Sequence, residues 1–132
     1  FVKTMLKLGQ KSDSLNVIFD QVGTPTYAKD LARAVMDVTQ DKGFSQKHFQ
    51  TNIVHYSNEG VCSWYDFAKT IFELADIQLQ VTPLETKDYP TAAKRPHYSV
   101  LNKTKIKQTY HLTIPYWKDS LRQCLKSLQA SS

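Results

Sequence analysis

The sequence predicts a mixed α/β fold with about five helices and a few short strands, and residues 1–132 are expected to form a single unit. Apolar residues at helical spacing alternate along the chain with short runs of β-branched and aromatic residues. The length of 132 residues, with 41% hydrophobic and 22% charged, is typical of one globular unit rather than a fibrous or disordered chain.

The first third of the chain is expected to form a helix, a strand and a second helix. Residues 1–8 have one apolar face over two turns, and residues 17–19 form an apolar run typical of a strand. Thr26 occupies the expected N-cap of a helix over residues 27–39. The side chains expected to be buried along this second helix are Ala28, Leu31, Ala32, Val35 and Val38.

The middle of the chain is expected to contain a loop at residues 43–51 and a strand at residues 52–56. Ser63 with Asp66 three residues later is a capping-box signature, which predicts the start of a helix. Trp64 and Phe67 are expected to anchor this helix in the core.

The last third is expected to begin with a strand at residues 77–81 and a long irregular segment at residues 84–100. Long segments of this kind are often functional. A short helix at residues 103–108 follows, with Asn102 as its cap, and Pro115 is expected to open the last helix. The apolar face of that helix comprises Trp117, Leu121, Cys124, Leu125 and Leu128.

Charge and cysteine usage restrict the class of partner. A net charge of +5 is compatible with nucleic acid, a membrane surface or an anionic small molecule. The sequence has neither a known nucleic-acid-binding motif nor an apolar run near the roughly 20 residues of a membrane helix, so we expect neither partner. Cys62 and Cys124 lack disulfide or zinc spacing, which is typical of reduced residues in a cytoplasmic protein, and the histidines show no metal-ligand spacing.

Four stretches together carry a family resemblance. Residues 20–32 read Asp-Gln-x-Gly-x-Pro-Thr-x3-Asp-Leu-Ala, and residues 1–8 precede them. Residues 55–60 with 63–68, and the more distinctive residues 89–102, follow in order. Over nearly the whole chain, the sequence resembles the dTDP-4-dehydrorhamnose reductases of the extended short-chain dehydrogenase/reductase family.

The resemblance implies a C-terminal substrate-binding lobe, with elements that pack on a dinucleotide fold. The family's glycine-rich fingerprint has no counterpart among the four glycines, so we expect the dinucleotide-binding domain to be absent and this chain to bind no nicotinamide. The pair Tyr65 and Lys69 matches the family's catalytic Tyr-x3-Lys spacing, but it lies in the helix that Ser63 opens, and no cofactor loop precedes it. We therefore expect the catalytic pair upstream and assign none here.

By this resemblance, the parent protein would reduce dTDP-4-dehydro-β-L-rhamnose to dTDP-β-L-rhamnose with NADPH or NADH. In the present chain, the strand at residues 17–19 would lie at an exposed or newly paired sheet edge, because the other strands of the parent's sheet are expected to be missing here. A homodimer could form through that edge. The alternative is a non-catalytic binding or regulatory relative with this fold, such as the methionine adenosyltransferase β-subunit.

The resemblance also suggests the site residues. In related nucleotide-sugar enzymes, an arginine in an Arg-Pro motif contacts the sugar-nucleotide diphosphate, and this position is Arg95. A guanidinium can bind phosphate oxygens in bidentate fashion. We expect Arg95 and Lys94 to bind the dTDP-sugar, with Gln21 and Thr24 shaping the same pocket. His97 stands near the place where relatives often have an aspartate, so we assign no ribose contact.

Overall fold

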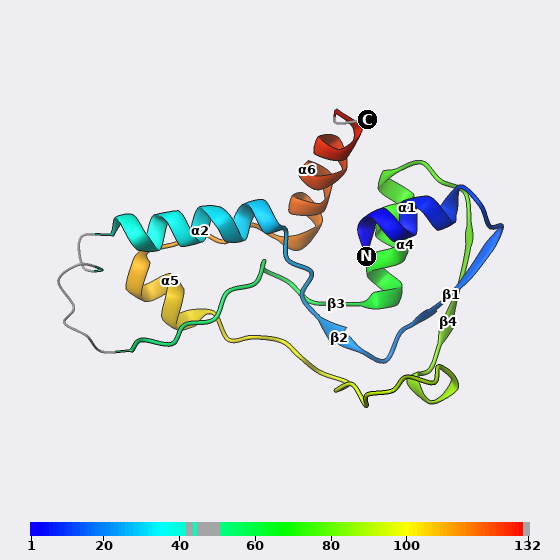
Figure 1. The fold of residues 1–132 in the computed structure, drawn as a ribbon, viewed down its shortest axis with the longest axis horizontal. Helices are drawn as coiled ribbons and strands as arrows, with labels where there is room; N and C mark the ends of the chain where they lie inside the picture. Colours follow the sequence, from blue (N-terminus) through cyan, green and yellow to red (C-terminus); the bar gives the residue numbers. More distant parts are fainter. Residues whose placement is uncertain (42–43, 45–50, 131–132) are drawn as a thin grey trace.

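The computed structural model describes residues 1–41, 44 and 51–130. This part of the chain has a mixed α/β fold of helices and short strands, which confirms the predicted fold class (Figure 1). The helices are α1 (Val2–Gly9), α2 (Ala28–Gln40), α4 (Trp64–Leu74), α5 (Thr104–Tyr110) and α6 (Trp117–Gln129). The strands are β1 (Ser14–Ile18), β2 (Val22–Gly23), β3 (Cys62–Ser63) and β4 (Gln80–Leu84), and η1 (Thr86–Asp88) is a 3-10 turn.

Two small sheets organise the described residues. β1 pairs in parallel with β4, with Val17 opposite Pro83, and β2 pairs antiparallel with β3. Figure 1 shows α1 and α4 beside the β1–β4 pair at one end of the molecule, with α2 and α5 at the other end. Proline is tolerated in a strand at a sheet edge, where its missing N–H breaks no ladder bond, and Pro83 occupies such a strand.

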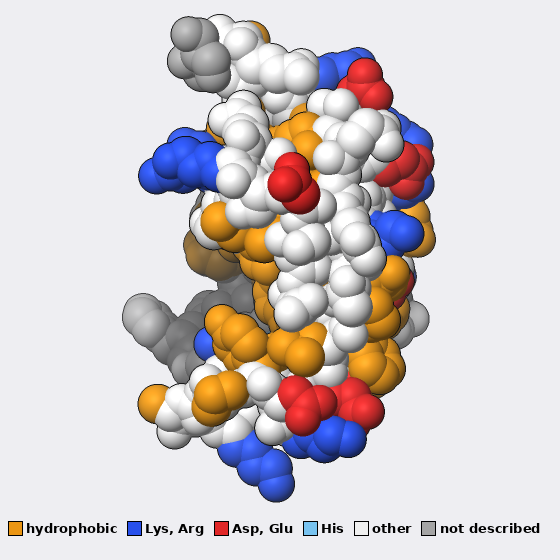
Figure 2. All heavy atoms as spheres, turned by 90° about the vertical axis from the view of Figure 1, so that its right-hand side faces the viewer, with side chains coloured by type: hydrophobic (Ala, Val, Ile, Leu, Met, Phe, Trp, Pro, Cys, Tyr) orange, Lys and Arg blue, Asp and Glu red, His pale blue; other side chains and the backbone are white. Residues whose placement is uncertain are grey.

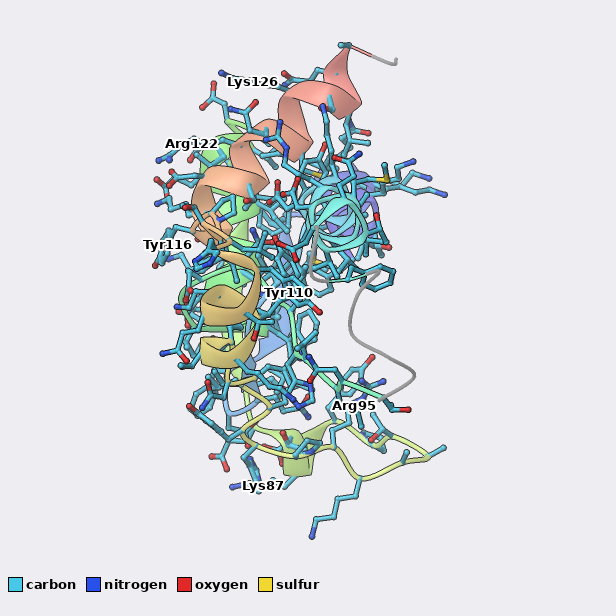
Figure 3. The ribbon with its side chains drawn as sticks, turned by 90° about the vertical axis from the view of Figure 1, so that its left-hand side faces the viewer. Lys87, Arg95, Tyr110, Tyr116, Arg122 and Lys126 are labelled. Carbon is cyan, nitrogen blue, oxygen red and sulfur yellow. The ribbon has the colours of Figure 1, made fainter. Side chains whose placement is uncertain are left out.

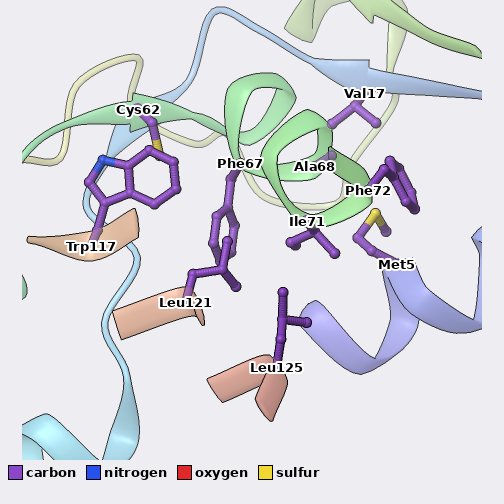
Figure 4. Packing of buried hydrophobic residues seen from close by; sticks show 10 residues of the cluster. All are labelled: Met5, Val17, Cys62, Phe67, Ala68, Ile71, Phe72, Trp117, Leu121 and Leu125. Carbon is purple, nitrogen blue, oxygen red and sulfur yellow. The ribbon is translucent and has the colours of Figure 1, made fainter. Parts of the chain in front are cut away.

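The hydrophobic core lies where α1, α4 and α6 meet β1 (Figure 4). Ala68 and Ile71 of α4 are fully buried at its centre. The ring of Phe67 meets the Trp117 indole edge-on, with ring centroids 5.8 Å apart. Phe67 is therefore the core anchor that the sequence predicted, and the predicted capping box is confirmed, since the Asp66 N–H donates to the Ser63 hydroxyl at 3.0 Å.

A polar network centred on Asn58 joins α2 to α6. The Asn58 side chain is fully buried, and its Oδ1 accepts the Tyr27 N–H at 2.8 Å. Its Nδ2 donates to the Asp30 carboxylate at 2.8 Å and to the Ser120 hydroxyl at 2.9 Å. The Ser120 hydroxyl in turn donates to Asp30. The cap of α2 thus comes from Asn58, and the prediction that Thr26 supplies it was wrong.

The predicted buried face of α2 was also wrong. Leu31 and Val35 are 43% and 53% exposed, Ala28 and Ala32 are exposed as well, and Val38 is only half-buried. The buried residue of this helix is Ala34, one turn after Asp30. Because the hydrogen bonds of Asp30 turn that side of the helix inward, the apolar stripe on the other side faces outward.

Three further expectations from the sequence differ from the structure. Residues 52–56 form no strand. The helix expected to start at Pro115 begins instead at Trp117, because the Pro115 carbonyl accepts the Glu59 N–H at 2.8 Å in an extended segment. Trp64 is 38% exposed, so it is not a core anchor.

Two predicted strands are present with shifted bounds, and the predicted irregular segment is present as well. The expected strand at residues 77–81 is β4, which starts three residues later, and the strand at residues 17–19 ends β1. Residues 89–100 carry no helix or strand, as expected for the irregular segment. The loop expected at residues 43–51 lies mostly outside the described residues. None of the helices in the described residues has the length and apolar character needed to cross a membrane.

The first prediction concerns Asn58. The substitution Asn58→Ala should lower the free energy of unfolding by about 2–3 kcal/mol, because it leaves the Tyr27 N–H and part of the Asp30 carboxylate without partners. Urea denaturation followed by circular dichroism measures the change. The control is Asn102→Ala, which removes one exposed bond to the Thr104 N–H and should cost less than about 1 kcal/mol. Equal losses in the two variants would contradict the role assigned to Asn58.

Candidate functional site

An open hollow of about 320 Å³ lies between the β2–β3 sheet, the start of α4 and the irregular segment. Its walls are residues 21–25, residues 62–64 with Phe67, and Arg95, Pro96 and Ser99. A neighbouring hollow of about 380 Å³ shares Gln21, Trp64 and Arg95 with the first. These three residues therefore stand where the two hollows meet.

The backbone of β2 holds the wall that carries Arg95. The Val22 N–H donates to the His97 carbonyl at 2.8 Å, and the Ser99 N–H donates to the Val22 carbonyl at 2.9 Å. On its other side, β2 pairs with β3 through Val22 and Ser63. A Cβ at Gly23 would lie 2.9 Å from the Ser99 hydroxyl, so a larger residue there would displace the Ser99 side chain. The hollow is thus lined by three backbone segments tied side by side.

The structure brings Arg95, Gln21 and Thr24 to the same hollow, but not Lys94. Lys94 is exposed and lines neither of the two hollows. Thr24 donates its hydroxyl to the Gly60 carbonyl at 2.6 Å, so only its lone pairs face a ligand. Gln21 is 5% exposed, and its amide nitrogen donates to the Thr86 hydroxyl at 3.0 Å. Both residues therefore serve mainly to build the wall.

Arg95 differs from these residues because its charge is not used within the fold. It is exposed and forms no ion pair or hydrogen bond within residues 1–41, 44 and 51–130. Figure 3 places it on the irregular segment, at the same end of the molecule as Lys87 and far from Arg122 and Lys126 of α6. An unpaired guanidinium at the edge of a hollow can bind an anionic group without breaking any existing contact.

Trp64 is the wall residue that sequence reasoning missed. It is the first residue of α4, and its ring lies 4.9 Å from that of Phe1, centroid to centroid. The aromatic pair borders the second hollow beside Arg95. The position of Trp64 directly after the Ser63 cap was the available signal, since a side chain at a helix start lies next to the preceding turn.

Three other reactive side chains of the described residues, Cys62, Tyr65 and Lys69, lie close to α4. Burial, followed by the nearby Asp66 charge, raises the pKa of the Cys62 thiol to about 12, so at neutral pH it is no nucleophile. Lys69 lies 5.9 Å from the ring centroid of Tyr65, and neither residue lines the hollows beside Arg95. Within the described residues, no group of three or more His, Cys, Asp or Glu side chains could hold a metal ion.

A second charged cluster lies away from the hollows. The Lys107 and Lys103 ammonium groups lie 2.8 and 3.3 Å from the Glu59 carboxylate. The hydrogen bond from Lys107, and then that from Lys103, hold the pKa of Glu59 below its usual range. Lys103 is 8% exposed and also donates to the Asn58 carbonyl at 3.0 Å. The first and last of the three lysines 103, 105 and 107 therefore stabilise the fold and are not free to bind a ligand.

The described residues thus form a mixed α/β fold with an open hollow, at whose edge Arg95 has no ion pair or hydrogen bond to another described residue. The chain belongs to the RmlD substrate binding domain family, whose model matches residues 1–130. The chain is 40% identical to the spore coat polysaccharide biosynthesis protein SpsK of Bacillus subtilis, over 96% of this chain and 41% of that protein.

Solved structures of reductases share the fold. A dTDP-4-dehydrorhamnose reductase from Clostridium acetobutylicum is 43% identical with a TM-score of 0.87, over 98% of this chain and 44% of that one. A dTDP-4-dehydrorhamnose reductase from Bacillus anthracis, solved in complex with NADP, is 36% identical with a TM-score of 0.81, over 93% and 41%. The chain thus spans less than half the length of these relatives.

Proposed function

We propose that this chain is the nucleotide-sugar-binding part of a dTDP-4-dehydrorhamnose reductase. In this proposal, residues 1–132 supply one substrate-binding portion, and the dinucleotide-binding domain and the catalytic Tyr-x3-Lys pair come from outside this chain. The complete enzyme reduces dTDP-4-dehydro-β-L-rhamnose to dTDP-β-L-rhamnose with NADPH or NADH. The relatives named dTDP-4-dehydrorhamnose reductase, of which this chain covers less than half, support this proposal.

The observation that carries the binding role is the unpaired Arg95 at the edge of the hollow. A dTDP-sugar presents a diphosphate between two ring systems, and Arg95 stands where two hollows of about 320 and 380 Å³ meet. A diphosphate at Arg95 would leave one hollow on each side of it for the rest of the ligand. Arg95 is therefore the proposed contact of the substrate diphosphate, and Gln21 and Thr24 form the wall beside it.

Lys94 has a weaker part in the proposal. Its side chain is exposed and lines neither hollow, so it would add long-range attraction to an anionic substrate rather than a direct contact. Attraction of this kind is screened by salt over a Debye length of about 10 Å at 0.1 M. Raising the ionic strength should therefore weaken the contribution of Lys94 more than that of Arg95. An equal loss for both residues would contradict this difference.

The second prediction tests Arg95 in the protein encoded by the complete reading frame. Arg95→Ala should weaken transition-state binding by about 1.5–3 kcal/mol, or about ten- to a hundredfold in kcat/KM. The loss should appear mainly in KM, because a diphosphate remote from the reacting carbonyl is bound similarly in the ground and transition states. Arg95→Lys should recover only part of the loss, since lysine keeps the charge but not the planar fork.

The control for this series is Lys105→Ala. Lys105 is exposed, and its ammonium donates to the Ile53 carbonyl at 2.8 Å, away from the hollows. Its removal should leave the kinetics near those of the wild type. Arg95→Ala kinetics that match the wild type, in a variant with an unchanged circular dichroism spectrum, would show that Arg95 is only a surface residue.

The third prediction concerns the cofactor, whose binding site we propose to lie outside this chain. Among the described residues, β1 leads into β2 and not through a glycine-rich turn into a helix, which is the connection that cradles a dinucleotide pyrophosphate. Calorimetry of the 132-residue chain with NADPH and NADH should therefore give no binding heat. Micromolar affinity for either nucleotide would place part of the cofactor site in this chain and overturn the division of roles.

The fourth prediction is self-association through β1. One edge of β1 pairs with β4, and the other edge has no strand partner within the described residues. An open strand edge is a template for pairing with another chain. Figure 2 also shows separate hydrophobic patches at the surface on the β1–β4 side of the molecule. We therefore propose a homodimer, and a strict monomer in light scattering at high concentration would contradict it.

We also propose that the protein acts in the cytoplasm without a nucleic-acid partner. Two free cysteines and the nature of the proposed substrate support the compartment. Lys103 and Lys107 are paired with Glu59, which weakens the basic stretch as a phosphate-binding stripe. A random DNA duplex should show no salt-dependent binding in fluorescence anisotropy, and a steep salt dependence would contradict this view.

A further inference from the structure

The segment from Thr86 to Ser99 carries Arg95 but, after η1, has no helix or strand of its own. In Figure 1 it runs from β4 along one side of the molecule towards α5. An irregular segment that becomes ordered only when a ligand binds loses conformational entropy at that step, which weakens binding. The contacts that hold this segment before binding therefore bear on how well Arg95 can act.

The start of the segment is held by Asp20 and Gln21. The Asp20 carboxylate accepts the Thr86 N–H at 3.0 and 3.1 Å through its two oxygens, and the Thr86 hydroxyl at 2.6 Å. The Gln21 amide nitrogen donates to the same hydroxyl at 3.0 Å. The Thr86 hydroxyl thus donates to Asp20 and accepts from Gln21. Its hydrogen bond is also the main cause that lowers the pKa of Asp20.

The end of the segment is held by Asp20 and Val22. His97 Nδ1 lies 2.9 Å from the Asp20 carbonyl and 3.6 Å from one Asp20 carboxylate oxygen. Because a carbonyl only accepts, this contact requires the proton on Nδ1. The backbone of Val22 bonds to His97 and Ser99, and the Ser99 hydroxyl donates to the Val22 carbonyl at 3.1 Å.

We infer that Asp20 is a positioning residue for Arg95. It contacts both ends of the segment that carries Arg95, and its carboxylate forms no ion pair with Arg95 itself within the described residues. Asp20 therefore acts by fixing the segment over the hollow, not by binding the ligand. This inference rests on the proposed function, because it assumes that Arg95 meets the diphosphate.

The test uses the protein encoded by the complete reading frame, with Asp20→Ala and the gentler pair Thr86→Val and Thr86→Ser. Hydrogen exchange of residues 87–96 should be at least about fivefold faster in Asp20→Ala and Thr86→Val, since the start of the segment is released. The dissociation constant for dTDP, measured by calorimetry, and KM for the dTDP-sugar should rise about three- to tenfold with kcat unchanged. Thr86→Ser keeps the hydroxyl and should restore wild-type values.

The matched control is Glu85→Gln. Glu85 lies next to Thr86 and pairs with Lys87 at 2.8 Å, whereas the hydrogen bonds to Asp20 and Gln21 come from Thr86. The substitution Glu85→Gln removes one carboxylate charge from the same end of the segment and leaves the hydrogen bonds of Thr86 to Asp20 and Gln21 in place. Exchange and dTDP affinity should stay at wild-type values in this variant. If Glu85→Gln lowers dTDP affinity as much as Asp20→Ala does, negative charge near the segment would explain the effect. The hydrogen bonds between Asp20 and Thr86 would then not be its cause, and the inference would be overturned.

The outcomes separate the inference from the proposed function. Unchanged exchange of residues 87–96 in Asp20→Ala and Thr86→Val would overturn the inference. Faster exchange with unchanged dTDP affinity, while Arg95→Ala weakens dTDP binding, would also overturn it but leave the proposed function in place. If Arg95→Ala itself leaves dTDP affinity unchanged, the proposed function fails, and the inference fails with it.

Discussion

The buried Asn58 side chain is the contact on which the arrangement of the helices depends. It caps α2 through the Tyr27 N–H and reaches α6 through Ser120. It also bonds to Asp30, so the rotation of α2 about its own axis is set by hydrogen bonds rather than by apolar burial. A buried amide of this kind is costly when its partners are lost, which makes the network a strict geometric constraint. Lys103 extends the constraint to the start of α5 by donating to the Asn58 carbonyl.

This constraint separates two kinds of packing in one small chain. Around α4, the core is apolar and includes the fully buried Ala68 and Ile71. Around α2, the inward side is Asp30 with Ala34, and the larger apolar side chains Leu31 and Val35 remain at the surface. Burial of those two side chains would be favourable by about 1.5–3 kcal/mol each, but it would require α2 to turn and lose the bonds of Asp30. Among the described residues, the bonds of Asp30 to Asn58 and Ser120 hold the other side of α2 inward.

The same distinction explains what the sequence could and could not predict. Local signals were sufficient where the partner lies nearby in the chain, as in the Ser63–Asp66 capping box. They failed for α2, because its cap and its orientation come from Asn58, 31 positions after Tyr27. The strand expected at residues 52–56 failed for a related reason: Ile53 is 69% exposed, and no neighbouring strand pairs with it among the described residues. Periodicity and propensity do not encode which distant group a helix or strand will meet.

The hollow shows the same limit at the level of single residues. Arg95, Gln21 and Thr24 could be chosen from motifs, and the structure places them together. The positioning role of Asp20 could not be predicted from motifs, because it depends on Thr86, 66 positions away, and on His97, 77 positions away. The fold is stabilised by the core and the Asn58 network, whereas the segment that carries Arg95 is held by a few hydrogen bonds at its two ends. Substitutions at those ends can therefore change ligand binding while leaving most of the fold intact, which is why exchange rates and dTDP affinity can be read separately from stability.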